Sequence, residues 1–279
     1  MVIATSVTKH RVTSAMLYLV LTLLALLTLY PFLFMVQSSL RSTSAFLANP
    51  FGFPTSPLWS NYSRAASSIW RYGLNSLIVT GATVVITVAS ASTLAYATGR
   101  LRFQGREAVF YISIAMMMVP FFILLVPLFL WLKQLGILNT YQGLVLPYSA
   151  FNLSLAIFIL RRVFEDLDEV LFEACRIDGG SEWTAFWRIA VPLARPIIGT
   201  VAFLTAIATW NDFLLAFLTL TNPSLFTLPL GEVEFTTRYS VEYGPLMAAY
   251  TIGSAPLVLL FVFVNRSFIA SFSRAKLKV

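Results

Sequence analysis

Residues 173–192 read EACRIDGGSEWTAFWRIAVP, and this stretch decides how the chain is organised. It is charged and contains two adjacent glycines, yet apolar runs of membrane-spanning length lie on both sides of it. Soluble domains carry about a quarter charged residues, whereas this 279-residue chain is 58% hydrophobic and only 11% charged. The stretch is therefore a polar interruption in a membrane protein.

Local signals around the glycines predict two short helices joined by a sharp turn. In the first helix, apolar residues recur at helical spacing and form one stripe. These residues are Leu167, Val170, Leu171, Ala174 and Ile177. Asp178, Gly179 and Gly180 end the helix, because glycine adopts the left-handed conformation without strain. Ser181 is a good N-cap for the second helix, and Pro192 predicts a turn into the next apolar run.

The rest of the chain contains six apolar runs, and a bilayer span needs roughly 20 apolar residues. The runs cover about residues 13–36, 72–98, 108–132, 142–160, 197–220 and 245–264. None alternates like a barrel strand, so helices satisfy the backbone hydrogen bonds in lipid. We expect an all-α, polytopic protein with six transmembrane helices. Its transmembrane domain covers residues 13–268, includes the segment 165–192, and lies between tails at 1–12 and 269–279.

The basic residues predict the orientation of these helices. When the six runs are threaded with the N-terminus in the cytoplasm, 14 of the 19 Lys and Arg residues face the cytoplasm. The outward five are Arg41, Arg64, Arg71, Lys133 and Arg238. This is the bias of the positive-inside rule, so both termini are expected in the cytoplasm. The same placement argues against a nucleic-acid-binding face, despite the net charge of +7.

Several classes of chemistry are excluded by composition. One cysteine, Cys175, allows neither an internal disulfide nor a cysteine metal cluster. The single histidine, His10, lies in the N-terminal tail, which removes histidine-based catalysis. No Gly-x-x-x-x-Gly-Lys-Ser/Thr sequence is present, so any ATP site must lie on another polypeptide. We therefore expect no catalytic residue, metal or cofactor on this chain.

Two explanations of the amphipathic segment 165–192 remain open. It could rest in the lipid interface, or it could dock into a protein partner. Its acidic residues argue for a partner, because anionic headgroups would repel them. They are Glu165, Asp166, Asp168, Glu169 and Glu173.

The stretch resembles the EAA signature of binding-protein-dependent ABC importer permeases: Glu-Ala-Ala, three residues, Gly, nine residues, Ile-x-Leu-Pro. Here Cys175 replaces the second alanine and Val191 the leucine, and the spacing agrees throughout. The resemblance implies the type I importer permease fold, in which a cytoplasmic coupling helix-turn-helix sits in a cleft of the ATPase subunit. The coupling residues that it implies are Glu173, Ala174, Cys175, Asp178, Gly179, Gly180, Ile189 and Pro192.

Further stretches resemble the carbohydrate branch of this family, in particular the smaller permease of maltose-type and glycerol-phosphate-type transporters. They are Asn61-Tyr62, Asn75-Ser76, residues 95–106, Met118-Val119-Pro120, residues 135–141 and Trp210-Asn211-Asp212. The resemblance implies import of a sugar, polyol or glycerol-phosphate compound across a bacterial or archaeal plasma membrane. The implied partners are a second permease, two ATPase subunits carrying ATP and Mg, and an extracytoplasmic solute-binding protein.

Two places are candidates for the solute pathway. Met117 and Pro120 lie in the third run, where proline is expected to kink the helix and to free backbone groups that a water-filled cavity or neighbouring protein must satisfy. Trp210, Asn211 and Asp212 combine an indole, an amide and a carboxylate, which suit a hydroxylated solute. The alternative, which we favour for Asp212, is that it ties helices together. The rival function is an ion-gradient-driven secondary transporter, but such proteins usually show paired ionisable residues and repeated halves, and neither is evident here.

Overall fold

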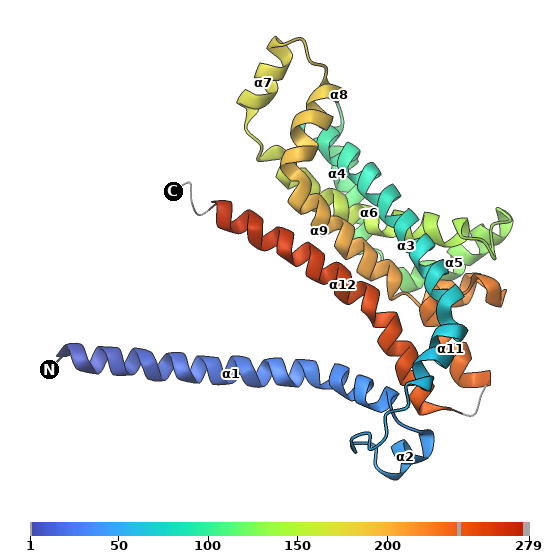
Figure 1. The fold of residues 1–279 in the computed structure, drawn as a ribbon. Coiled ribbons are helices and arrows are strands. Elements are labelled where there is room, and N and C mark those ends of the chain that lie inside the picture. Colours follow the sequence, from blue (N-terminus) through green and yellow to red (C-terminus); the bar gives the residue numbers. More distant parts are fainter. Residues whose placement is uncertain (1, 239–240, 276–279) are drawn as a thin grey trace. The chain divides into compact units, whose positions relative to one another are not determined.

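The computed structural model describes residues 2–238 and 241–275, and within these ranges the chain is helical and contains no strand. The prediction of an all-α chain is confirmed (Figure 1). The elements are α1 (Val2–Ser39), α2 (Thr43–Ala48), α3 (Ser60–Arg100), α4 (Arg106–Ala115), η1 (Met116–Met118), α5 (Phe121–Gln134), α6 (Gln142–Glu165), α7 (Glu169–Ile177), α8 (Glu182–Ala185), η2 (Phe186–Ala190), α9 (Val191–Trp210), α10 (Leu214–Thr219), η3 (Pro223–Leu225), α11 (Leu228–Arg238) and α12 (Tyr243–Ala275). The last four residues of the predicted C-terminal tail, 276–279, lie outside the described residues.

Five of the described helices are long and apolar enough to cross a membrane, and a sixth span results if one bent helix pair counts as one. This agrees with the six predicted runs, although their bounds differ. The helix α3 is the longest, with 41 residues. At about 1.5 Å per residue it measures roughly 60 Å, twice the roughly 30 Å of a bilayer's hydrocarbon core. Part of α3 must therefore lie outside the lipid.

The third span is broken where a kinked helix was expected. The segments Arg106–Met118 and Phe121–Gln134 meet at an angle of 101°. Pro120 lies at the break in extended conformation and precedes α5, whereas Pro127 remains inside α5. The first proline interrupts the helix because it both lacks an amide hydrogen and disfavours helical geometry in the residue before it.

The fifth span begins earlier and ends earlier than the predicted run 197–220. The elements α8, η2 and α9 form one continuous helix, Glu182–Trp210. The predicted turn at Pro192 is therefore wrong. Pro192 has no amide hydrogen to donate, but the preceding turn is widened to a π-helix, in which the amide of Val191 donates to the carbonyl oxygen of Phe186. This wider turn accommodates the proline without ending the helix.

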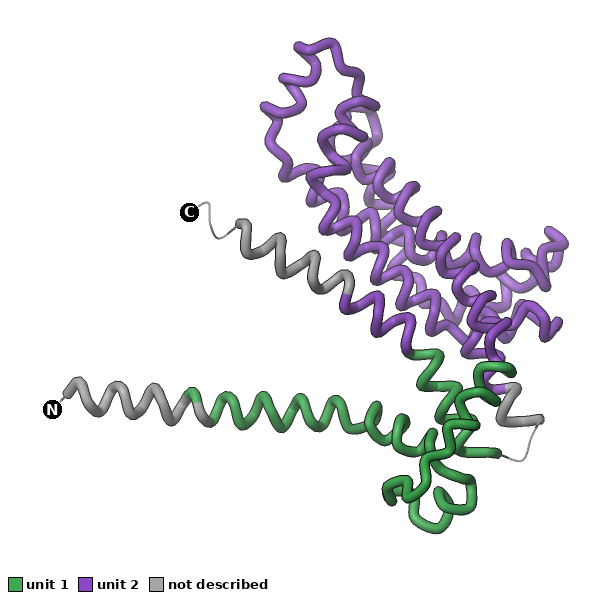
Figure 2. The backbone as a smooth tube through the Cα atoms, in the orientation of Figure 1, with its two compact units in different colours: residues 1–68, 235–254 green, residues 69–234, 255–279 purple. Residues whose placement is uncertain are grey.

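The chain divides into two compact units, which Figure 2 colours separately. Unit 1 consists of residues 1–68 and 235–254, and unit 2 of residues 69–234 and 255–279. The helices α3 and α12 each contribute to both units. The segment 165–192 belongs wholly to unit 2, so its contacts are those of that unit.

In unit 1, hydrogen bonds from two side chains hold the loop between α1 and α3. Arg41 is 5% exposed and donates to the carbonyl oxygens of Asn49 and Pro50. Asn61, in the first turn of α3, donates to the carbonyl oxygens of Ser39 and Arg41. Because each buried donor meets a backbone acceptor, the loop has a defined conformation rather than an open one.

In unit 2, a cluster of buried aromatic rings lies beneath the segment 165–192. Tyr96 of α3 contacts the rings of Phe164, Phe172 and Phe186, which come from α6, α7 and η2. All four residues are at most 4% exposed. The segment is thus packed onto the helical core of unit 2.

Candidate functional site

The segment 165–192 forms the predicted helix, turn and second helix. Asp168 caps the first helix, α7, with its carboxylate accepting from the amide of Val170 at 3.0 Å. Beyond the end of α7, Gly179 lies in the turn and has a left-handed backbone conformation with a φ of 79°. Ser181 caps α8, and its hydroxyl accepts from the amide of Thr184 at 3.2 Å.

The two glycines of the turn are needed for different reasons. Gly179 has a left-handed backbone, which residues with a Cβ adopt only with strain. Gly180 donates its amide to the carbonyl oxygen of Cys175 at 2.8 Å. A Cβ on Gly180 would lie 2.8 Å from that same oxygen and also too close to the sulfur of Cys175. The turn therefore fits only glycine at residue 180 unless its surroundings move.

The helix α7 has two apolar faces, of which the sequence pattern showed one. Phe172 is 1% exposed and packs on the core. On the outer face, Val170 is 64% and Ile177 86% exposed, and Leu171 is also exposed. An exposed apolar patch with a polar border is typical of a protein or membrane contact. The predicted stripe is thus the side of α7 that this chain leaves uncovered.

The structure brings most of the predicted coupling residues together at the turn. Glu173, Ala174, Asp178 and Gly179 are exposed there, and Cys175 and Gly180 are partly covered. Ile189 and Pro192 lie farther along, in the continuous helix Glu182–Trp210. Ile189 packs against the buried aromatic cluster, so it supports the segment from below and is not part of its outer surface.

Arg176 forms the ion pairs within the segment. Its spacing from Glu173 would permit an i,i+3 pair, but Arg176 instead lies 3.0 Å from Glu169 and 3.0 Å from Glu182. The hydrogen bonds that Arg176 donates to Glu169 and then to Glu182 raise its pKa. Within the described ranges Glu173 has no ion-pair partner of its own. Its carboxylate is available to a group on another chain.

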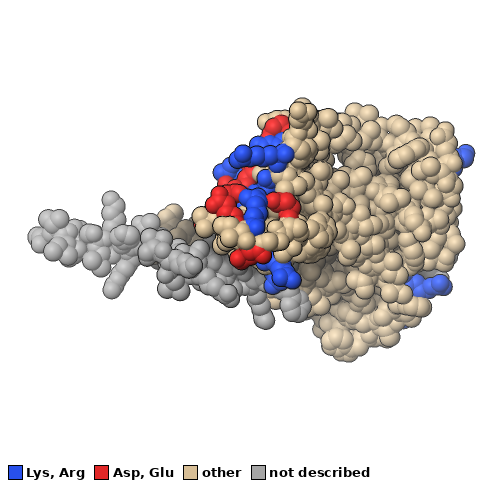
Figure 3. Space-filling model, turned by 90° about the horizontal axis from the view of Figure 1, so that it is seen from above, with Lys and Arg blue, Asp and Glu red and all other residues tan. Residues whose placement is uncertain are grey.

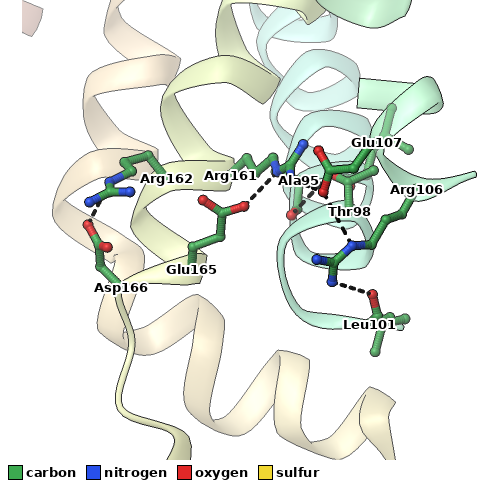
Figure 4. Close-up of polar contacts among 10 residues, drawn as sticks. Ala95, Thr98, Leu101, Arg106, Glu107, Arg161, Arg162, Glu165 and Asp166 are labelled. Atoms are coloured by element: carbon green, nitrogen blue, oxygen red, sulfur yellow. Dashed lines mark hydrogen bonds and ion pairs between the residues drawn. The ribbon is translucent and has the colours of Figure 1, made fainter. Parts of the chain in front are cut away.

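A second set of charges lies where α3 and α6 end and α4 begins, and sequence reasoning missed it (Figure 4). The guanidinium of Arg161 is 8% exposed and lies 2.7 Å from both Glu107 and Glu165. It also lies 3.8 Å over the ring of Phe110. Figure 3 shows most of the Lys, Arg, Asp and Glu side chains of the face seen from above gathered in one region, with separate Lys or Arg side chains at the opposite edge of an otherwise uncharged surface. Glu165 has the i,i+4 spacing from Arg161 that a sequence search could have found, whereas Glu107, on α4, has no local sequence signal.

The predicted pathway residues lie in two separate places in the fold. Met117 is in the short helix η1 and is exposed, and Pro120 lies at the 101° break. Trp210 ends α9 and is buried, and Asn211 follows as its cap and is exposed. Asp212 accepts hydrogen bonds from the hydroxyl of Tyr148 and the amide of Leu215.

An apolar groove of about 650 Å³ lies beside the break in the third span. Its walls come from α5 and α6 and include Pro127, Trp131 and Phe151. Met116 reaches it, but none of the predicted pathway residues does. Its lining is almost wholly apolar, so it does not resemble a site for a hydroxylated solute.

Comparison with known proteins identifies close relatives over nearly the whole chain. The probable ABC transporter permease protein YurM of Bacillus subtilis is 33% identical over 95% of this chain and 88% of its own length. The diacetylchitobiose uptake system permease protein NgcG of Streptomyces coelicolor is 31% identical over 94% of this chain and 88% of its own length. The trehalose/maltose transport system permease protein MalG of Thermococcus litoralis is 32% identical over 92% of this chain and 94% of its own length.

A solved structure shares the fold. A chain of a bacterial ABC transporter involved in the import of the acidic polysaccharide alginate superposes with a TM-score of 0.80, at 23% identity, over 92% of this chain and 96% of that chain. The fold is thus that of a type I ABC importer permease, as predicted. The family model for binding-protein-dependent transport system inner membrane components matches residues 91–274, which include the whole segment 165–192. With the exposed helix-turn-helix and the apolar helices, this shows that the chain is a multi-pass ABC transporter permease and belongs to the family of binding-protein-dependent transport system inner membrane components.

Proposed function

We propose that this chain is one of two permease subunits in an ATP-driven importer for a sugar or a related polyol or glycerol-phosphate compound. The relatives named for diacetylchitobiose uptake and trehalose/maltose transport support this class of solute. The observation that carries the proposal is the outer face of α7, where exposed Val170 and Ile177 lie beside the unpaired Glu173. A permease that has no ATP site of its own needs such a surface to receive work from a separate ATPase.

The coupling role is assigned to the residues of the EAA-like pattern. In this proposal Glu173 and Asp178 offer charge to the ATPase, and Gly179 and Gly180 set the shape of the turn. Ala174 and Cys175 have short side chains, so they leave the carboxylate of Glu173 accessible to the ATPase. Ile189 and Pro192 join the turn to α9 in one continuous helix.

The partners follow from this role. A second, different permease completes the pathway, two cytoplasmic ATPase subunits bind ATP and Mg, and an extracytoplasmic solute-binding protein delivers the solute. The chain itself carries out no covalent chemistry. Both termini lie in the cytoplasm of a bacterium or archaeon, with residues 1–12 and 269–279 as tails and residues 13–268 as the permease domain in the plasma membrane.

The solute pathway is assigned to two places, the break in the third span and the end of α9. Met117 and Pro120 are assigned to the wall of the pathway because the break in the span exposes backbone groups there. Trp210 and Asn211 are assigned to the same pathway. For Asp212, the contacts with Tyr148 and Leu215 favour the tying role over contact with the solute.

The proposal is tested with the chain co-expressed with its partners and reconstituted in vesicles. Gly179→Pro cannot keep the φ of 79°, so we expect ATP hydrolysis without solute uptake in a complex that still inserts into the membrane. Gly179→Asn is the matched control, because asparagine tolerates the left-handed conformation, and it should retain most of the uptake. Normal uptake by the Gly179→Pro complex would contradict the coupling role. Ion-driven uptake by this chain alone would instead support the secondary transporter.

A further inference from the structure

A continuous series of polar contacts runs through the helix-turn-helix. It begins at Arg100 and ends at Tyr96, and both of these residues are on α3. Arg100 lies 3.1 Å from one carboxylate oxygen of Glu169, whose other oxygen lies 3.0 Å from Arg176. Arg176 in turn lies 3.0 Å from one oxygen of Glu182, and the hydroxyl of Tyr96 donates to the other oxygen at 3.0 Å. We call these five residues the brace.

The brace returns to the helix on which it begins. Tyr96 and Arg100 are four residues apart, so they share one face of α3. Each of the two glutamates uses one oxygen toward α3 and the other toward Arg176. The α7 helix and the start of α8 are therefore held against the same turn of α3, with Arg176 joining them across the glycine turn.

Buried aromatic rings support the brace from beneath. The guanidinium of Arg100 lies 3.9 Å over the ring of Phe172, a cation–π contact. The ring of Tyr96 lies 5.1 Å from that of Phe186. The Arg100 side chain is only 10% exposed, so its charge is much less screened than that of a surface arginine.

The backbone connections of α7 to its neighbouring helices constrain it less. Residues 166–168 join it to α6 without helical structure, and the glycine turn joins it to α8. The helix from α8 to α9 passes through the π-helical segment η2. The two ion pairs of Arg176 are exposed and contribute little to overall stability, so the brace acts mainly by fixing the position of α7 relative to α3.

From this arrangement we infer that Tyr96 and Arg100 are positioning residues for coupling, and that α3 is the span to which a displacement of α7 is transmitted first. This inference rests on the proposed function. It goes beyond it by naming residues outside the EAA-like pattern and the helix that receives the force. When a substitution on α3 removes one contact of the brace, α7 should still bind the ATPase, but its displacement should no longer move α3.

The test measures solute uptake per ATP hydrolysed by the complete transporter in vesicles. Arg100→Met should lower this ratio at least fivefold while the four-part complex still assembles. Arg100→Lys keeps a charge near Glu169 and the ring of Phe172, and it should restore most of the ratio. The matched control is Arg162→Met, which removes an exposed pair with Asp166 just before α7 and leaves α3 untouched. Its ratio should equal that of the wild type.

A second variant keeps the test decisive if Arg100→Met prevents assembly. Tyr96→Phe removes one hydroxyl and keeps the buried ring, and it should lower the ratio at least twofold. If Tyr96→Phe and every assembled Arg100 variant couple normally while Gly179→Pro uncouples, the brace has no positioning role and the proposed function stands. If no ATPase binds the chain at all, the proposed function fails and the inference fails with it.

Discussion

Tyr148, on α6, donates a hydrogen bond of 2.6 Å to the carboxylate of Asp212, in the link between α9 and α10. The same carboxylate oxygen accepts the amide of Leu215 at 3.0 Å. Tyr148 is 5% exposed. A carboxylate near a membrane span is costly unless its partners are in place, and here a side chain and a backbone amide supply them. Asp212 thereby joins α6 to the start of α10.

Tyr148→Phe should destabilise the purified complex by about 1–2 kcal/mol, because it removes a hydrogen bond to a charged group. Asp212→Asn keeps an acceptor oxygen for both donors and removes only the charge, so it should cost less, and adding it to Tyr148→Phe should cost little more. Thermal denaturation in detergent measures the three values. Solute half-saturation should not change. A large increase in Asp212→Asn alone would assign the carboxylate to the solute instead.

Removing the charge of Arg161 and removing the charges of its two glutamate partners should destabilise the protein by different amounts. Glu107 and Glu165 have 46% and 33% exposed side chains, so water can solvate them without Arg161, whose own side chain is 8% exposed. The double variant Glu107→Gln, Glu165→Gln leaves a buried unpaired charge and should cost about 3 kcal/mol. Arg161→Met should cost less. Denaturation midpoints that rank the two variants in the opposite order would contradict this account.

Substitutions of Asn139 should separate the contributions of its backbone conformation and of its side-chain hydrogen bonds to stability. It has a φ of 57°, and its side-chain oxygen accepts the amides of Thr221 at 2.6 Å and Asn222 at 3.0 Å. Asn139→Gly loses only the side-chain bonds, whereas Asn139→Ala also adds left-handed strain of about 1–2 kcal/mol. The alanine variant should therefore melt below the glycine variant. Asn139→Asp, which keeps the acceptor, should lie nearest the wild type.

Glu232, on α11, predicts a dependence on pH. Burial raises its pKa from 4.5 to about 7, so the folded protein binds this proton more tightly than the unfolded chain does. Its stability should therefore be greatest below about pH 4.5 and fall as the pH rises to about 7, by roughly 3 kcal/mol at most. Glu232→Gln should remove this part of the pH profile. A wild-type carboxyl infrared band that titrates near pH 4.5 would contradict the shift.

Much of the architecture could be predicted from local signals. Apolar run length indicated the spans, and Gly179 with Ser181 predicted the turn and the cap. The 101° break at Pro120 was underestimated, because proline predicts an interruption but tertiary packing decides its angle. The continuity through Pro192 was missed for a related reason, since a widened turn can accept a residue without an amide hydrogen.

Contacts between distant residues were the part that sequence could not supply. The stripe containing Val170 and Ile177 was assigned correctly to one face of α7, yet periodicity does not tell which face the core covers. Phe172, which packs inward, broke the pattern and was left out. Likewise Glu169 and Glu182 lie on different sides of the turn, so a search for pairs three or four residues apart could not find their shared partner, Arg176.

The π-helical segment Phe186–Ala190 has a consequence for how this permease tolerates length changes. A π turn holds one residue more than an α turn, and each α-helical residue advances the side chains by about 100°. If one residue is removed from this segment, the helix can return to regular α-helical winding. Trp183 and the apolar side of α9 then keep their relative orientation about the helix axis. The same removal one turn further on would swing everything before it by nearly a third of a revolution. Loss of a single codon should thus be tolerated in this segment and disabling one turn beyond it.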